Sequence, residues 1–375
     1  MKEVNILLTI AWLFISSFVF GQDSAIHDDG PYVFYDAGRI ESMQIEKGAV
    51  QQKNIDPAGN RMINIFFSAH PDWNFSVSLR KKLSIEPSSC REPKKIFFVS
   101  DIEGEFEAFR ALLINNEIID SNYKWIFGDG HLVICGDLFD RGEEVVQELW
   151  LLYKLEDDAK AAGGYVHTLL GNHDIMNLSG DTRYVLPFYF ANAKAMGKNY
   201  MDLYSKSTEL GRWLRTKNIV ERIGNYLCLH AGISPFINAQ GLSVQSINDI
   251  CRPWYDQGQN DHALDSAHVS PLFDENSPFW YRGYFLEPRA SMMAIDSTLD
   301  LFDCKKIIVG HTILTINPAM YYQGKVIGID VNEHEGQRAG VLYQDKKWWV
   351  VDGEGIRIPL EYRPTNDSIN PHHVH

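Results

Sequence analysis

The chain has 375 residues, of which 45% are apolar and 12% aromatic, enough for one large globular core with a smaller module beside it. Acidic residues outnumber basic ones by 49 to 35, and the formal charge of −14 opposes binding to polyanions. We therefore expect no nucleic-acid partner and no attachment to an anionic membrane surface.

The first residues have the pattern of a secretory signal. Lys2 precedes an apolar run from Ile6 to Phe20, and the small residue Gly21 is followed by polar residues. A run this short, with no basic residues after it, is typical of a cleaved signal and not of a permanent anchor. The sequence predicts a signal peptide at residues 1–21 and an exported protein, periplasmic or secreted, with no stable membrane anchor.

Residues 28–85 predict a small β-rich module. Apolar runs at 32–35, 62–67 and 75–79 have the composition of strands, and residues 54–59 form a turn between them. A segment at 86–93 that contains two prolines reads as a linker.

The pattern changes at Ile96. Between 96 and 358, short apolar runs alternate with amphipathic helical stretches, which predicts an α/β or α+β domain built around sheets. We expect helices at 106–114, at 144–162 and through most of 184–217, and strands again within 325–358. Residues 359–375 read as a polar tail, in which His372, His373 and His375 have no partner residues for a metal site.

The cysteines are few and odd in number, so a dense disulfide framework is excluded. Cys135 and Cys228 lie inside apolar runs and are predicted to be buried free thiols. Cys90, Cys251 and Cys304 are candidates for one disulfide, and the sequence does not choose the pair.

Five apolar runs end in polar residues. Open sheets bind ligands beyond the carboxyl ends of their strands, so five such ends can converge on one site. The side chains collected in this way carry oxygen or imidazole donors and no thiolate, namely Asp101, Glu103, Asp137, Asn172, His230 and His311. Such a set suits two neighbouring divalent cations of the Mn, Fe, Zn or Mg type, with Asp137 as the candidate bridge.

The ordered motifs Asp101-Ile102-Glu103-Gly104, Gly136-Asp137 with Asp140-Arg141-Gly142, Gly171-Asn172-His173-Asp174, His230-Ala231-Gly232 and Gly310-His311 resemble the calcineurin-like metallophosphoesterase superfamily. Within it, residues 210–217, 230–235 and 279–283 resemble the Shewanella-like protein phosphatases of the phosphoprotein-phosphatase branch. The resemblance covers about 96–355 and does not include the N-terminal module. It implies a four-layer β-sandwich of two mixed sheets flanked by helices.

One residue departs from the family motif. The first motif usually reads Asp-x-His-Gly, and Glu103 replaces the histidine. If Glu103 is a ligand, the first metal has an all-carboxylate protein shell, which favours Mn or Mg over Zn. The alternative is that Glu103 only accepts a hydrogen bond and leaves this metal weakly held.

The resemblance also implies roles for the remaining motif residues. Two divalent ions would activate a metal-bound hydroxide that attacks phosphorus, with His173 as general acid and Asp140 orienting its imidazole. Arg141 and Arg282 would bind the phosphate oxygens. Arg183 is a third candidate, with a surface ion pair as the alternative. Asp174 receives no catalytic role, Asp330 is a candidate to close the site, and His334 is assigned to a loop away from the chemistry.

These expectations describe an exported, metal-dependent phosphatase that acts on phosphoric monoesters in small molecules, phosphopeptides or proteins. One rival is a hydrolase of dinucleoside polyphosphates or other phosphoanhydrides, because fold and metal site do not determine the substrate. A second rival, from another class, is a non-catalytic surface binding protein. The oligomeric state is left open.

Overall fold

The computed structural model describes residues 25–258, 269–313, 317–332, 334 and 336–364. The predicted signal at 1–21 and most of the predicted tail lie outside these residues. Within the described part of the chain, no helix has the length and apolar character needed to cross a membrane.

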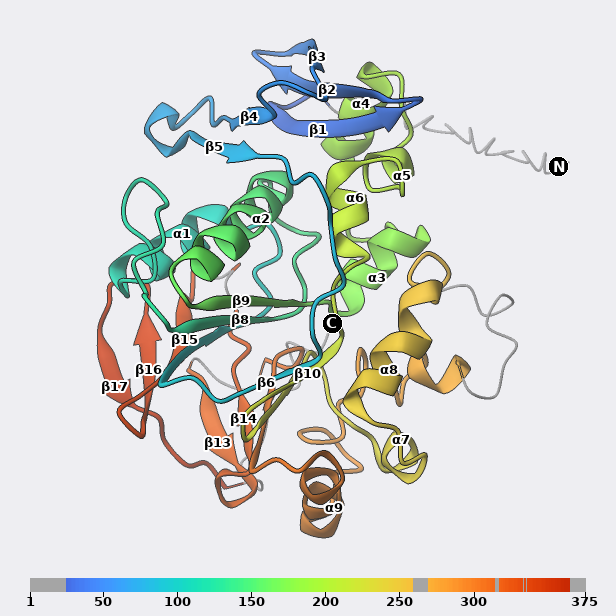
Figure 1. Ribbon diagram of the computed structural model, residues 1–375. Coiled ribbons are helices and arrows are strands. Elements are labelled where there is room, and N and C mark those ends of the chain that lie inside the picture. Colours follow the sequence, from blue (N-terminus) through green and yellow to red (C-terminus); the bar gives the residue numbers. More distant parts are fainter. Residues whose placement is uncertain (1–24, 259–268, 314–316, 333, 335, 365–375) are drawn as a thin grey trace, which may run out of the picture.

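Two six-stranded mixed sheets form the body of the protein (Figure 1). The first sheet has the order β17-β16-β15-β7-β8-β9, with strands β7 (Lys95–Val99), β8 (His131–Cys135), β9 (Tyr165–Leu169), β15 (Ala339–Gln344), β16 (Lys347–Asp352) and β17 (Arg357–Pro359). The second has the order β13-β14-β12-β11-β10-β6, with strands β6 (Ser89–Cys90), β10 (Val220–Ile223), β11 (Tyr226–Leu229), β12 (Lys306–Val309), β13 (Ala319–Tyr321) and β14 (Val326–Gly328).

An apolar layer between the two sheets holds them face to face. Alternate residues of facing strands supply it, such as Val133 and Cys135 of β8, and Ile223 of β10, all of them buried. Successive side chains of a strand point to opposite faces of the sheet, so every second residue of these strands faces the other sheet. The predicted sandwich of two mixed sheets is confirmed.

Helices cover the outer faces of the sandwich. α1 and α2 lie over the first sheet, and α7, α8 and α9 lie around the second (Figure 1). The helices are α1 (Phe106–Asn115), α2 (Val145–Ala161), α3 (Asn172–Ser179), α4 (Pro187–Ala195), α5 (Tyr200–Leu203), α6 (Glu209–Leu214), α7 (Pro235–Ala239), α8 (Val244–Cys251) and α9 (Met292–Phe302). Short 3₁₀ turns occupy Pro71–Trp73, Arg252–Trp254, Ser270–Leu272 and Tyr322–Gly324. The predicted helices at 106–114 and 144–162 are confirmed within a residue or two, whereas 184–217 is divided among three short helices.

The N-terminal module consists of two small antiparallel sheets, with β1 (Asp29–Asp36), β2 (Arg39–Glu46) and β3 (Ala49–Ile55) in one and β4 (Met62–Ile65) and β5 (Phe75–Ser78) in the other. Its buried side chains, including Tyr32 and Phe75, belong to the same hydrophobic cluster as those of α1 and α2. The module therefore shares its core with the sandwich helices. The predicted linker is also partly ordered as a strand, because Ser89 and Cys90 pair in parallel with β10.

No disulfide joins the three candidates, because Cys90, Cys135, Cys228, Cys251 and Cys304 are all free thiols. Cys135 and Cys228 are buried, as expected.

A buried ion cluster joins the module to the sandwich. The fully buried Glu156 of α2 accepts hydrogen bonds from Lys217 Nζ (2.5 Å) and from Arg80 Nη1 (2.8 Å), the latter at the end of the module. Trp213 Nε1 and Thr168 Oγ1 occupy its remaining acceptor sites, at 3.0 and 3.2 Å. Burial opposes the charge of Glu156, but Lys217 and Arg80 outweigh it and hold the pKa of Glu156 below its ordinary value.

We predict that Glu156→Gln destabilises the fold by about 3–5 kcal/mol, because the fully buried Lys217 ammonium loses its nearer counter-ion and keeps only Glu86, at 3.5 Å. Urea unfolding of the metal-free protein measures the change. Asp157→Asn is the matched control: Asp157 also pairs with Arg80 but is 55% exposed, and its loss should cost less than about 1 kcal/mol. Equal losses for the two variants would contradict this account of how the module is attached.

Candidate metal and phosphate site

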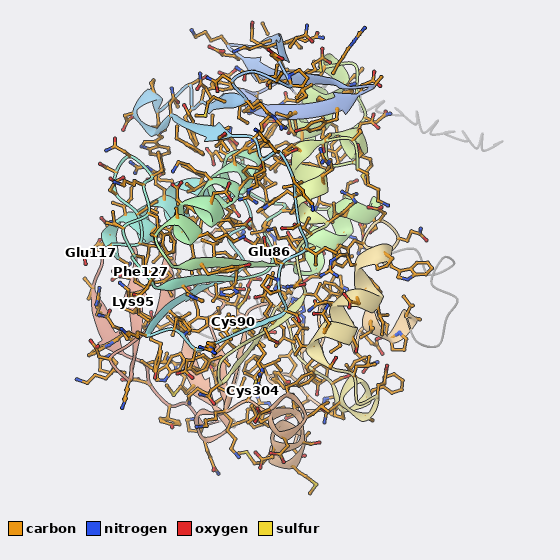
Figure 2. All side chains as sticks on the ribbon, viewed as in Figure 1. Glu86, Cys90, Lys95, Glu117, Phe127 and Cys304 are labelled. Atoms are coloured by element: carbon orange, nitrogen blue, oxygen red, sulfur yellow. The ribbon has the colours of Figure 1, made fainter. Side chains whose placement is uncertain are left out.

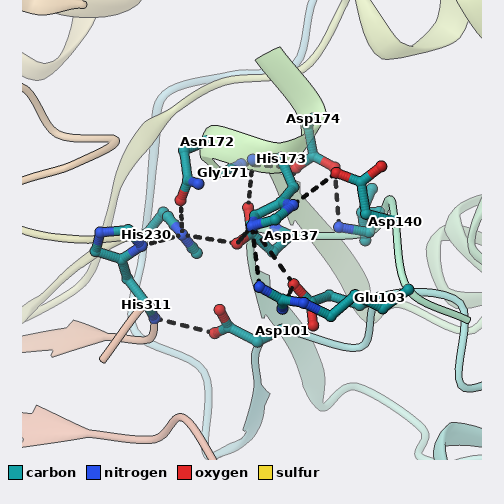
Figure 3. A network of polar contacts seen from close by, with 12 residues as sticks. Asp101, Glu103, Asp137, Asp140, Gly171, Asn172, His173, Asp174, His230 and His311 are labelled. Atoms are coloured by element: carbon teal, nitrogen blue, oxygen red, sulfur yellow. Dashed lines mark hydrogen bonds and ion pairs between the residues drawn. The ribbon is translucent and has the colours of Figure 1, made fainter. Parts of the chain in front are cut away.

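The predicted ligands meet where the strands of both sheets end (Figure 3). Asp101 and Asp137 each follow their strand, β7 and β8, by two residues, and Asn172 opens α3 directly after β9. His230 and His311 follow β11 and β12 of the other sheet. Strand ends from two sheets thus bring together residues that lie up to 210 positions apart in the chain.

The backbone at this edge is left-handed. Six predicted site residues have φ between 48° and 80°, a region that non-glycine residues rarely adopt, and they are Asp101, Glu103, Asp137, Asp140, Arg141 and His311. Each such conformation costs on the order of 1–3 kcal/mol and persists only where the surrounding structure imposes it. The turns direct the side chains of several strand exits into one space.

Two glycines let the chain pass close to the carboxylates. A Cβ on Gly171 would overlap Oδ1 of Asp137, and one on Gly310 would overlap Oδ2 of Asp101. Only a residue without a side chain permits this approach. The glycines in the motifs are therefore required by packing against the ligands themselves.

Asp137 lies at the centre of the cluster. His230 Nε2 is 3.2 Å from Asp137 Oδ2, 2.8 Å from Asn172 Oδ1 and 3.0 Å from His311 Nδ1. On the other side, ligand atoms of Asp137, Glu103 and His173 lie within 4.8 Å of one another, as do those of Asp137, His230 and His311. Asp137 belongs to both groups, which is the arrangement expected of a bridging carboxylate.

The cluster is buried and strongly acidic. Asp101, Glu103, Asp137 and Asp330 are all less than 10% exposed. Burial raises the pKa of Asp101 to about 6; His230 opposes this effect, and the neighbouring Asp137 and Glu103 add to it. Burial, together with Asp101 and Glu103, also raises the pKa of Asp330. Buried like charges repel unless cations lie between them.

The donor set fits divalent cations. Carboxylate, amide and imidazole donors suit ions of the Mn, Mg, Fe or Zn type, and no thiolate is among them. The buried Nε2 of His311 and the buried Oδ1 of Asp330 have no hydrogen-bond partner among the described residues. The residues that would hold two cations are those predicted from the sequence, Asp101, Glu103, Asp137, Asn172, His230 and His311.

A cavity of about 230 Å³ opens over this cluster. Its wall combines acidic groups, imidazoles, two guanidinium groups and a few apolar side chains, from Asp101, Glu103, Asp137, Arg141, His173, Arg282, His311, Ile313, Asp330, Val331, Asn332 and His334. Asp330, expected to close the site, lies in this wall.

His173 is held in place by Asp140. Its Nδ1 is 2.6 Å from Asp140 Oδ2, and Asn177 Nδ2 donates to the other oxygen of the same carboxylate at 2.9 Å. Burial disfavours the charged imidazole, but Asp137, Asp140 and Glu103 outweigh it and raise the pKa of His173 to about 9. In the metal-free protein these acids favour the protonated imidazole, and His173 is among the residues that line the cavity.

Asp174 has a structural position. Its carboxylate accepts hydrogen bonds from the backbone N–H groups of Asp137, Leu138 and Gly171, at 3.1, 2.8 and 2.6 Å. It thereby connects the turn after β8 to the start of α3, which agrees with the absence of a catalytic assignment from the sequence.

The three predicted arginines occupy different places. Arg141 and Arg282 line the cavity, where Arg141 pairs with Glu103 and Arg282 donates to the backbone oxygen of His311 at 2.7 Å. Arg183 is 64% exposed, pairs with Asp181 and does not line the cavity. This position agrees with the alternative, a surface ion pair, while the phosphate-binding role of Arg183 stays a prediction.

The sequence analysis missed His334. It was assigned to a loop away from the chemistry, yet its Nε2 is 2.5 Å from Glu103 Oε2 and its Nδ1 is 2.9 Å from Glu105 Oε1. An imidazole thus contacts the residue that replaces the motif histidine. No spacing signal in the sequence connects positions 231 residues apart, so only the fold reveals this contact.

We predict that Glu103→Gln weakens Mn²⁺ binding to the metal-stripped protein about tenfold or more, because the cluster loses an anionic oxygen beside Asp137. Electron paramagnetic resonance of free Mn²⁺ measures the affinity. In Glu103→His the preference should move toward Zn²⁺, since imidazole is a softer donor.

Glu105→Gln is the control for this prediction, because Glu105 also contacts His334 but is not among the cavity residues. Its Mn²⁺ affinity should stay within about twofold of the unmodified protein, well below the tenfold effect of an altered metal neighbour. An unchanged Mn²⁺ affinity in Glu103→Gln would show that Glu103 only accepts hydrogen bonds.

Curated relatives and solved structures that resemble this chain include the following three. Shewanella-like protein phosphatase 1 of Plasmodium berghei is 29% identical over 232 residues, which cover 58% of this chain and 61% of that protein. Shewanella-like protein phosphatase 2 of Arabidopsis thaliana is 25% identical over 336 residues, 75% of this chain and 83% of the relative. The cold-active protein-tyrosine phosphatase of a psychrophilic Shewanella species superposes with a TM-score of 0.81 at 32% identity.

The structural match covers 89% of this chain and 99% of the Shewanella phosphatase. Residues 94–375 make up less of the chain than that, so the match extends into the N-terminal module, which the sequence resemblance had not included. The family model of calcineurin-like phosphoesterases matches residues 94–314, which contain all six predicted metal ligands. The chain therefore belongs to the calcineurin-like phosphoesterase family.

Proposed function

We propose that the protein is a metal-dependent phosphatase that hydrolyses phosphoric monoesters, with phosphotyrosine or phosphoserine in peptides and proteins as the substrate class. The observation that carries the proposal is the cavity that four of the candidate metal ligands, two arginines and His173 line together, with Asp140 hydrogen-bonded behind His173. Its volume of about 230 Å³ accommodates a phosphoryl group, with the rest of the substrate outside.

The site offers two kinds of partner to the oxygens of a phosphate ester, bound cations and guanidinium groups. When bound, two divalent cations, with manganese preferred and Mg, Fe or Zn as alternatives, supply Lewis acidity and activate the attacking water. Arg141 and Arg282 can donate to phosphate oxygens through planar, charge-assisted hydrogen bonds. Arg141 pairs with Glu103 and its Nη2 lies 3.4 Å from His173 Nε2, so it is positioned between the acidic cluster and the general acid.

His173 supplies the proton that the leaving oxygen needs. Asp140 accepts from Nδ1 of His173, which supports the protonated imidazole and leaves Nε2 available to the substrate. The backbone N–H of His173 donates to Asp137 Oδ1 at 2.9 Å, which ties the acid to the centre of the metal cluster. Proton donation by a side chain placed in this way is worth about 10²–10⁴ in rate.

An aromatic side chain beside two of the cavity residues supports aryl phosphates as substrates. Tyr184 is 36% exposed, and its ring centre lies 5.1 Å from that of His173 and 5.7 Å from Cζ of Arg141. A phenyl ring attached to a phosphate beside these two residues can stack or pack edge-on against Tyr184.

The location of the enzyme remains part of the proposal. The apolar run near the N-terminus and the absence of following basic residues support export to the periplasm or the medium. An exported phosphatase would meet phosphopeptides and small phosphoesters instead of cytoplasmic dinucleoside polyphosphates.

We predict that His173→Ala lowers kcat for phenyl phosphate by about 10²–10⁴, and by clearly less for p-nitrophenyl phosphate, whose leaving group departs without a proton. Steady-state kinetics with the two substrates measures the difference. Asp140→Asn should change kcat in the same direction, because it removes the partner that keeps His173 charged.

Metal content and circular dichroism of both variants serve as controls for folding. An equal loss with both substrates would mean that His173 is not the proton donor.

We also predict that Tyr184→Ala raises KM for a phosphotyrosine peptide roughly 2–10-fold and leaves KM for a phosphoserine peptide unchanged, since only the former presents a ring. Tyr184→Phe keeps the ring and should behave like the unmodified protein. Diadenosine tetraphosphate is tested in parallel. Its hydrolysis together with failure on both peptides would favour the phosphoanhydride rival, and no turnover of any of the three would favour the binding-protein rival.

A further inference from the structure

A second group of metal-binding side chains lies away from the catalytic cavity. Ligand atoms of Cys90, His131 and His167 all lie within 4.8 Å of one another, and His131 Nδ1 is 2.9 Å from His167 Nε2. None of the three lines the cavity over Asp137. Figure 2 marks Cys90 on the linker strand beside β10.

The fold assembles this group from three strands of both sheets. Cys90 ends β6 of the second sheet, whereas His131 begins β8 and His167 lies in β9 of the first. In the parallel β8–β9 register, His131 is opposite Tyr165, two residues before His167, so both imidazoles are on the same face. That face is the one that Val133 and Cys135 present to the layer between the sheets.

A buried carboxylate supports one of the histidines. Glu221 of β10 is 2% exposed, and its Oε2 is 2.5 Å from His167 Nδ1. Asn218 Nδ2 donates to Oε1 of the same carboxylate at 2.8 Å, which fixes its orientation. A carboxylate behind one ring nitrogen, with the other nitrogen directed at further donors, is the typical environment of a metal-binding histidine.

The donor chemistry differs from that of the catalytic cluster. One thiol and two imidazoles favour a borderline-soft divalent ion such as Zn²⁺, whereas the carboxylate-rich catalytic set favours harder ions. Burial, together with the neighbouring His167, lowers the pKa of His131 to about 4, whereas for His167 burial is outweighed by Glu221, which raises the pKa of His167 to about 9. A cation bound here would therefore displace a proton from His167. Cys90 and His131 are only half-buried, so the group is in contact with solvent on their side.

The two candidate sites lie at opposite ends of β8. His131 begins the strand and Asp137 follows its end, a separation of roughly 20 Å at about 3.3 Å per residue. A cation at the first position therefore cannot take part in the chemistry at the second.

We propose that Cys90, His131 and His167, with Glu221 behind His167, form a separate site for a Zn²⁺-like cation. The ion would connect the linker strand β6 to the first sheet, across the layer between the sheets. It would act there as a coordinative cross-link, in a chain whose five cysteines are all free of disulfides.

Cobalt binding tests the proposal directly. Co²⁺ is added to metal-stripped, fully reduced full-length protein, and the near-ultraviolet spectrum is recorded. A cysteine thiolate bound to Co²⁺ gives a charge-transfer band there, which the thiolate-free catalytic cluster cannot produce. We expect this band in the unmodified protein, and we expect Zn²⁺ to displace it.

Variants locate the band. Cys90→Ser and His131→Gln should each abolish it, and Glu221→Gln should weaken Co²⁺ binding at this site about 10–100-fold. Cys304→Ser is the matched control, because Cys304 is also half-buried but lies near α9, outside the cluster (Figure 2). The Cys304→Ser variant should show the same charge-transfer band as the unmodified protein.

The absence of a charge-transfer band in the unmodified protein, with Co²⁺ bound elsewhere, would overturn the proposal. The group would then be a hydrogen-bonded chain of His131, His167 and Glu221. A band that Cys304→Ser removes and Cys90→Ser keeps would also overturn it. Because the signal comes only from the thiolate, either outcome leaves the proposed phosphatase function untouched.

Discussion

The repulsion among buried carboxylates around Asp137 is the constraint on which the site depends. Asp101, Glu103, Asp137 and Asp330 face one small cavity from the ends of strands in both sheets. Without cations, burial raises the pKa of Asp101, whereas for Asp137 burial is outweighed by His230 and His173, which hold the pKa of Asp137 below its ordinary value. Left-handed turns and glycines hold these acids close together, so the strained backbone conformations of this region lie at the candidate metal site.

Much of this could be predicted from the sequence because strand ends have a local signature. Each of the apolar runs before Asp101, Asp137, Asn172, His230 and His311 is a strand, and the topological rule that strand ends converge holds. Contacts across the fold have no such signature. His334 reaches Glu103 from a loop far along the chain, and His131 meets His167 and Cys90 through sheet register and sheet packing, which no motif encodes. Arg183 follows the His173 motif closely in the chain, but its side chain pairs with Asp181, two residues away.

The N-terminal module illustrates another limit. Its strands were visible in the alternation of residues, but its role in the core was not, since shared burial depends on which helix faces it. The Glu156 cluster and the pairing of Cys90 with β10 show that module and linker are attached to the sandwich by specific contacts. Two groups of donor atoms lie at opposite ends of β8: an oxygen-rich group around Asp137, and a group that includes the sulfur of Cys90 from the linker. One chain can thereby distinguish a hard catalytic ion from a softer structural one.

The central claim is that Asp137 bridges two cations, with Asp101 and Glu103 on one side and Asn172, His230 and His311 on the other. Crystals of the metal-stripped protein soaked with Mn²⁺ and measured at the manganese absorption edge test it most directly. The account predicts two anomalous peaks that share Asp137 as a common ligand. A single peak, or two peaks of which neither contacts Asp137, would contradict it.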